Sequence, residues 1–298
     1  MNQSEAALLI EKQALESLTY KTDNFLNHPI RLIQASKSLI GLNLDSPNKK
    51  LLNFNSLILK ENSYKIIDSK NYLNDSDIKE VISTHDLEQA FVNNDRSKIF
   101  NELCQLSKVS SPLHILEYFV EITLKQTGIS FLIIWSIYRI IFFISQKDVN
   151  FFLDLSIEAI LSDNFCFKDS SLLSINNEDI INYSNLSTFD IDLFSHLLEA
   201  YNSNLIRFDK INPLISAMIN QKLSYDKKNI SMETNFKYPE LFNKGRSWLL
   251  DFIHNIDNNN ITIELILFLD SIRCLFKFSD KKTHKLICSH FERLVGSF

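Results

Sequence analysis

Residues 129–145 read ISFLIIWSIYRIIFFIS, and this run is the most informative stretch of the chain for its fold. A helix built from it is apolar on nearly every side, which is typical of a central helix in a bundle. The alternative is a membrane-spanning helix. The run is 17 residues long, at the lower limit for crossing a bilayer. Arg139 would cost about 2.5–3.5 kcal/mol near the bilayer centre. We therefore expect a buried helix and no membrane span.

The scarcity of glycine indicates the fold class of the whole chain. The 298 residues include four glycines and five prolines, whereas average usage would give about twenty glycines. All-β folds need both residues in tight turns, and nucleotide-binding α/β folds need glycine clusters beside phosphates. Hydrophobic residues make up 45% of the chain, and 23 phenylalanines suit a thick helical core. The sequence predicts an all-α fold, a multi-helix bundle of roughly ten to twelve antiparallel helices.

Apolar residues at helical spacing, with capping residues at segment starts, predict where the helices lie. The expected helical segments are 4–20, 29–42, 77–83, 87–106 with a break near 93–95, 112–127, a helix around Trp135, 149–161, 189–202, 213–223, 239–256, 262–278 and 281–295. Strands compete in one place, where Leu57-Ile58-Leu59 and Tyr64-Lys65-Ile66-Ile67 flank a polar tripeptide. That pattern predicts either a short β-hairpin near 56–68 or an irregular segment.

Residues 162–190 divide the predicted helices into two groups. Ser, Asn and Asp dominate this stretch and no clear period runs through it, which is typical of a surface loop or a link between lobes. We therefore expect an N-terminal helical bundle over 1–161 and a C-terminal helical part over 162–298. Both parts are expected to pack into one globular unit.

Charge and cysteine usage bear on partners and location. The formal net charge is -5, and without a run of Lys or Arg a nucleic-acid partner is disfavoured. The four cysteines, Cys104, Cys166, Cys274 and Cys288, are widely spaced without a Cys-x-x-Cys pair. They are expected to be reduced, buried thiols. The first residues lack the basic segment of a secretory signal, so the expected location is cytoplasmic.

Candidate catalytic residues are single side chains, because GxSxG, GxGxxG, P-loop and HExxH patterns are absent from the sequence. His28 and His114 lie at predicted helix starts, where each either caps a turn or faces a cavity. Arg139 is a charge within an apolar helix, so it either pairs with a buried acid or anchors an anionic substrate. Trp135, four residues earlier, lies on the same side of that helix. The candidate catalytic residues are thus His28, His114 and Arg139, with Trp135 and Arg139 for substrate binding.

Metal ligands on a helix must recur three or four residues apart. His284 and Cys288 meet that spacing, but two ligands are half a zinc site. We expect no metal site, and these two residues come nearest to one. His196 and Glu199 also share a helix face and are expected to be a solvated surface pair. Asp270 is expected to face water as well.

One family resemblance can be drawn from local motifs. Asp86-Leu87-Glu88-Gln89-Ala90 with Asn94-Asp95, followed by 112–140, resembles a helical segment of the questin-oxidase-like proteins. His28-Pro29 and Thr283-His284-Lys285-Leu286 are similar to further patches of that group. The resemblance covers about a quarter of the chain and implies a helical oxidoreductase. Where a histidine would follow Phe131, this chain has Leu132-Ile133-Ile134, so no catalytic residue is carried over.

Two functions therefore remain open. The first is a helical protein-interaction or assembly protein without its own chemistry, which self-associates or binds a protein partner. The alternative is a helical oxidoreductase-like enzyme with a histidine-lined or Arg139-anchored cavity. The sequence indicates no particular cofactor for either function. Because catalytic motifs are absent, we expect the first.

Overall fold

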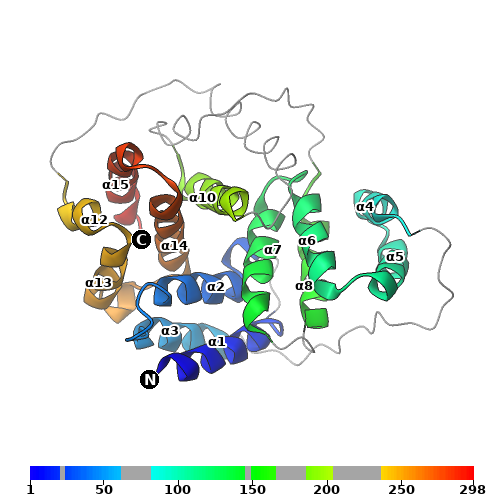
Figure 1. Ribbon diagram of the computed structural model, residues 1–298, viewed down its shortest axis with the longest axis horizontal. Helices are drawn as coiled ribbons and strands as arrows, with labels where there is room; N and C mark the ends of the chain where they lie inside the picture. The colour runs from blue at the N-terminus through cyan, green and yellow to red at the C-terminus, as the bar shows by residue number, and fades with distance from the viewer. Residues whose placement is uncertain (21–23, 62–81, 145–148, 166–185, 204–235) are drawn as a thin grey trace. The chain divides into compact units, whose positions relative to one another are not determined.

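The computed structural model describes residues 1–20, 24–61, 82–144, 149–165, 186–203 and 236–298 (Figure 1). The regular elements within these ranges are all helices. An isolated bridge between Gln126 and Phe165 is the one β-type pairing found there. The predicted all-α, multi-helix fold is therefore confirmed for the part of the chain that the structure describes.

Apart from α3, over which no helix was predicted, the helix bounds follow the predicted segments closely. The elements are α1 (Gln3–Ser17), η1 (Phe25–Asn27), α2 (Pro29–Ile40), α3 (Lys49–Glu61), α4 (Thr84–Val92), α5 (Arg96–Val109), α6 (Pro112–Thr123), α7 (Ile129–Ile140), η2 (Ile141–Phe143), α8 (Val149–Ser162), α10 (Thr188–Asn202), α12 (Pro239–Lys244), η5 (Gly245–Ser247), α13 (Trp248–Asn255), η6 (Asn258–Asn260), α14 (Ile263–Phe278) and α15 (Lys281–Val295). The helix predicted at 213–223, and nearly all of the one at 77–83, lie outside the described residues.

The predicted strand at Leu57-Ile58-Leu59 is wrong, because these residues belong to helix α3. Leu57 is exposed, whereas the buried side chains of this helix recur at helical spacing: Leu51, Leu52, Asn55 and Leu59. Burial of that stripe fixes the helical period, and only Ile58 of the three residues is β-branched. The second half of the predicted hairpin, 64–67, lies outside the described residues.

The chain divides into two compact units that interleave along the sequence. Unit 1 comprises Met1–Ile10, Leu32–Ile58 and Lys168–Phe298, and unit 2 comprises Glu11–Arg31 and Leu59–Phe167. The expected division into 1–161 and 162–298 stays a prediction.

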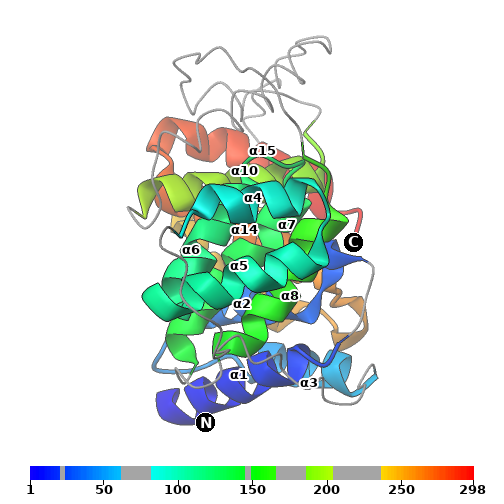
Figure 2. The same cartoon turned by 90° about the vertical axis from the view of Figure 1, so that its right-hand side faces the viewer.

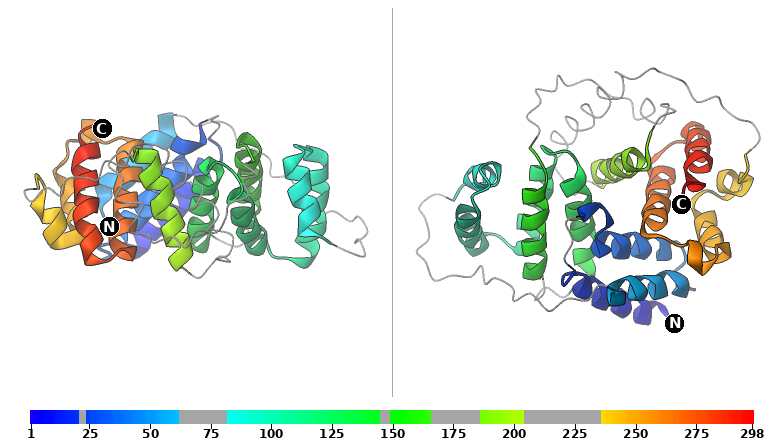
Figure 3. Two further views of the ribbon diagram at one scale, coloured as in Figure 1. Left: turned by 90° about the horizontal axis from the view of Figure 1, so that it is seen from above. Right: turned by 180° about the vertical axis from the view of Figure 1, so that it is seen from behind.

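Unit 1 is organised around helix α14. This helix contacts both α10 and α15 and lies between them, as the view from above shows (Figure 3). Every residue from Leu265 to Phe276 is buried. Thr262 begins the helix by accepting the backbone N–H of Leu265 on its side chain, at 3.1 Å. A polar side chain in this stretch of α14 is shielded from water and therefore needs a hydrogen-bonding or charged partner within unit 1.

Unit 2 is organised around α6, α7 and α8, which contact one another (Figure 2). Helix α7 contains most of the apolar run that opened the sequence analysis, and every residue from Ser130 to Tyr138 is buried. Asp163, just beyond α8, accepts the N–H of Ser130 at 3.1 Å and its hydroxyl at 2.9 Å. This carboxylate caps α7 in place of Gly128, which has no side chain to do so. Among the described residues, no helix combines the length and apolar character that crossing a membrane requires.

Gly245 interrupts the helix predicted over 239–256. It adopts φ 59° and ψ -143°, a conformation that other residues adopt at a cost of about 1–3 kcal/mol. We expect Gly245→Ala to lower the free energy of unfolding by that amount in urea denaturation. A Cβ there would lie 3.7 Å from Phe276, an ordinary contact, so the loss comes from the backbone. Gly296→Ala is the control, because φ is -75° and the surroundings are open. Equal stability of both variants would contradict this account.

Candidate functional site

His28 is a buried side chain of unit 2 that completes a helix start. It is 1% exposed, and its Nδ1 accepts the backbone N–H of Ile30 at 3.2 Å, as a capping side chain does. Its ring stacks on Phe25 and meets Tyr20 edge-on. Burial lowers the pKa of His28 to about 4, with the Tyr20 backbone opposing and the charge of Arg31 adding to the shift. The imidazole is therefore neutral at physiological pH.

Stability should depend on pH through His28. Its folded-state pKa of about 4 lies below the unfolded value of about 6.5, so the unfolded chain binds the proton more readily. The contribution is fully present above pH 6.5 and is lost as pH falls toward 4, by about 3 kcal/mol in all. His28→Asn, which keeps an acceptor for Ile30, should remove this part of the pH dependence in urea titrations at several pH values. His114→Asn should leave it unchanged, and an unaltered slope in His28→Asn would refute the assignment.

The other predicted catalytic and substrate residues occupy different environments in unit 2. His114 is exposed at the start of α6, where the hydroxyl of Ser111 accepts its backbone N–H at 3.3 Å. Arg139 is half-buried near the end of α7. Trp135 is 1% exposed, with its ring stacked on Phe131 and on Tyr138. Catalysis or substrate binding by His28, His114, Trp135 and Arg139 stays a prediction.

His284 and Cys288 lie on α15 in unit 1, four residues apart as the sequence has them. The ring of His284 packs against Phe276, with centroids 4.6 Å apart. Burial, with a smaller effect of Glu292, raises the pKa of the Cys288 thiol to about 12. Among the described residues, the group of three side chains that could hold a metal ion lies elsewhere, between α10 and α14.

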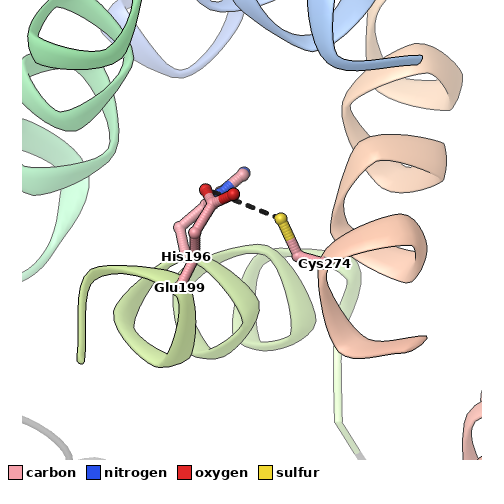
Figure 4. Close-up of side chains that lie close together, drawn as sticks. All are labelled: His196, Glu199 and Cys274. Carbon is pink, nitrogen blue, oxygen red and sulfur yellow. Dashed lines mark hydrogen bonds and ion pairs between the residues drawn. The ribbon is translucent and has the colours of Figure 1, made fainter. Parts of the chain in front are cut away.

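Six ionisable side chains meet where α10 packs on α14, and we name them the buried charge cluster: Asp192, His196, Glu199, Asp270, Arg273 and Cys274. Figure 4 shows three of them, with His196 and Glu199 pointing from α10 toward Cys274 on α14. The prediction that His196 and Glu199 form a solvated surface pair is wrong, because both are 5% exposed. Asp270, also expected in water, is 1% exposed.

Helical spacing explains why these residues converge. Asp192, His196 and Glu199 recur at intervals of four and three on α10, so they share one face. Asp270 and Cys274 are four residues apart on α14 and likewise share a face. Two polar stripes, each within a largely buried helix, face each other. One feature of the sequence indicated this site: the charged residues Asp270 and Arg273 lie within the apolar run 265–276, as Arg139 lies within the apolar run of α7.

Arg273 joins the two stripes. Its Nε donates to Asp270 Oδ1 at 2.5 Å on its own helix, and its Nη2 donates to Glu199 Oε1 on α10 at 3.4 Å. The same Nη2 lies 3.0 Å from Cys274 Sγ. Burial lowers the pKa of Arg273, but Asp270, Cys274 and Glu199 together raise it above its usual value, so the guanidinium stays charged.

His196 presents its two ring nitrogens to different groups. Its Nδ1 lies 3.4 Å from Glu199 Oε2 and 3.8 Å from Cys274 Sγ. Its Nε2 lies 3.4 Å from Asp192 Oδ1 and 3.9 Å from Asp270 Oδ2. Asp192 Oδ1 in turn accepts the hydroxyl of Ser271 at 3.1 Å. Every polar atom of the imidazole therefore faces an acidic group.

The cluster holds more negative than positive charge. Three carboxylates face one guanidinium, which leaves an excess of two negative charges before His196 is counted. Burial lowers the pKa of His196, but Cys274 and hydrogen bonds with Asp192 and Glu199 outweigh it, so the pKa is raised well above its usual value. Burial raises the pKa of the Cys274 thiol, opposed by Arg273. The arrangement thus favours a bound cation, which can be the proton on His196.

No protein-family model, curated protein or solved structure matches the chain. The resemblance to questin-oxidase-like proteins accordingly stays a prediction. Most of the residues that suggest it, Asp86–Ala90 and 112–140, belong to unit 2, whereas the buried charge cluster belongs to unit 1.

Proposed function

We propose that the protein is a helical enzyme of the oxidoreductase kind whose reactive centre is the buried charge cluster of unit 1. The observation that carries the proposal is the approach of an imidazole, a carboxylate and a thiol to within 4.8 Å inside a packed core. Ionisable groups with shifted pKa values gather at functional sites. It differs from the centre predicted at His28, His114 and Arg139, which stays a prediction.

A purely structural role accounts poorly for the buried charge cluster. Removing each ion from water costs several kcal/mol, and well-packed apolar replacements of buried ion pairs are often neutral or stabilising. Groups retained at that cost are better explained by chemistry. In the proposed enzyme His196, Glu199 and Cys274 form the reactive centre, and Arg273 holds Glu199 in place.

A charge-balanced double variant tests this proposal. His196→Leu/Asp192→Leu removes one positive and one negative group, so we expect a folded protein with an unfolding free energy within about 2 kcal/mol of wild type. Turnover of a small-molecule cell extract, followed by untargeted mass spectrometry with oxygen uptake, should be lost. The matched control is Arg96→Gln/Glu158→Gln, an exposed ion pair of unit 2, which should keep full turnover. Equal turnover by the wild type and by His196→Leu/Asp192→Leu would contradict the proposal.

An exposed pair of rings favours a second candidate function. Phe142 and Phe143, in η2 after α7, are 59% and 45% exposed. Adjacent exposed aromatic rings are typical of interaction surfaces. As the alternative we propose a helical interaction or assembly protein in which this pair mediates self-association.

Self-association predicts a concentration-dependent mass. Light scattering after gel filtration should show a dimer for the wild type and a monomer for Phe142→Ser/Phe143→Ser, because the variant lacks the apolar contact. Val109→Ser, which changes a single residue that is 60% exposed in the same unit, should remain a dimer. A wild type that is monomeric at every concentration would exclude this alternative and leave the enzyme proposal untouched.

The cellular location is also a proposal. Cys104, Cys274 and Cys288 are free, buried thiols, as expected for the described cysteines, and Cys166 lies outside the described residues. Reduced thiols suit a reducing compartment. On this ground we propose a cytoplasmic location.

A further inference from the structure

We propose that His196, Glu199 and Cys274 bind a first-row transition-metal dication such as Zn²⁺ or Fe²⁺. The inference deepens the proposed function and rests on it, since both assign chemistry to the same cluster. Metal binding, however, is measured without any substrate, so each proposal can fail without the other.

The spacing of the donor atoms around His196 is close to that of ligands on one metal ion. His196 Nδ1 lies 3.4 Å from Glu199 Oε2 and 3.8 Å from Cys274 Sγ. Zinc bonds of about 2.1 Å to nitrogen and oxygen and 2.3 Å to sulfur, at tetrahedral angles, place such donors roughly 3.4–3.6 Å apart. The separations of His196 Nδ1 from the other two donors are thus close to those of ligands that share an ion, and all three donor atoms lie within 4.8 Å of one another.

The second nitrogen of His196 supports the same assignment. A histidine that ligates a metal usually donates its other N–H to a carboxylate, which fixes the tautomer and the ring orientation. His196 Nε2 faces Asp192 Oδ1 at 3.4 Å, and Ser271 donates to that oxygen at 3.1 Å. Asp192 is therefore a positioning residue that leaves the Nδ1 lone pair directed toward Glu199 and Cys274.

Arg273 orients the two other ligands. It donates to Glu199 Oε1, which leaves Oε2 as the oxygen nearest to His196. It also lies within hydrogen-bonding distance of Cys274 Sγ, at 3.0 Å. Hydrogen bonds of this kind to ligating carboxylates and thiolates are the usual support of a metal site. A dication between the ligands would also offset the excess of carboxylate charge in the buried charge cluster.

The donor set selects the class of metal. One imidazole nitrogen, one carboxylate oxygen and one thiolate sulfur suit zinc, iron or cobalt, whereas Mg²⁺ and Ca²⁺ prefer oxygen alone. Three protein ligands leave at least one coordination position open. An open position is typical of catalytic metal sites, whereas structural sites are closed by four protein ligands.

Cobalt substitution provides the test. Untagged full-length protein, purified under reducing conditions, should contain one zinc or iron per chain by plasma mass spectrometry. After removal of that metal with a chelator, Co²⁺ should bind at one per chain and give the near-ultraviolet charge-transfer band of a cobalt thiolate. Cys274→Ser should lose the band, and Asp192→Asn should weaken Co²⁺ binding by about 10–100-fold while keeping the band. Glu199→Gln should also weaken binding, and it serves if Cys274→Ser does not fold.

Two matched variants in unit 1 serve as controls. Cys288→Ser changes another buried thiol and His290→Gln another buried histidine, and neither belongs to the buried charge cluster. Both should bind Co²⁺ as the wild type does, with circular dichroism confirming the fold of every variant. Absence of stoichiometric metal together with absence of saturable Co²⁺ binding would overturn the assignment. So would an equal loss of the thiolate band in Cys288→Ser and Cys274→Ser.

Discussion

The ion pair that Arg273 makes across the seam, the interface where α10 packs on α14, is the interaction on which unit 1 depends. A guanidinium within the fully buried run 265–276 must be neutralised locally, and Asp270 and Glu199 do so from the two helices. Two carboxylates beside one guanidinium leave one negative charge, which favours a second positive group at the interface between α10 and α14. His196 lies against those acids. The placing of acidic groups around His196 therefore follows from the same need to neutralise a buried charge.

The sequence predicted the fold well because long helices carry their own signal. The break near 93–95, the helix start at Pro112 and apolar residues at helical spacing placed α5, α6 and α14 close to their observed bounds. The error at Leu57-Ile58-Leu59 arose because a short apolar run fits a strand or part of a helix equally well, whereas the burial pattern of α3 follows a helical stripe. Leu57 and Leu59 themselves favour a helix, so local propensity and the burial period agree there.

The site was harder to predict for a physical reason. His196 and Glu199 are visible as a pair on one helix, but their environment depends on Cys274, which lies 78 residues further along the chain. Periodicity shows which residues share a face and says nothing of which helix that face meets. The one usable clue was internal to α14, where Asp270 and Arg273 interrupt an apolar run. A charge flanked by apolar residues on both sides requires a partner, and two such helices can provide partners for each other.

The complete burial of Cys274 has a kinetic consequence. With a side chain 0% exposed, the sulfur cannot meet a reagent in bulk water while α10 and α14 stay together. A reagent larger than a diatomic gas or an ion can reach the sulfur only after α10 and α14 separate locally. The frequency of such openings depends on the local stability of this region. The rate of any reaction at Cys274 would then be limited by the rate at which α10 and α14 separate. Tighter packing between the two helices would lower that rate.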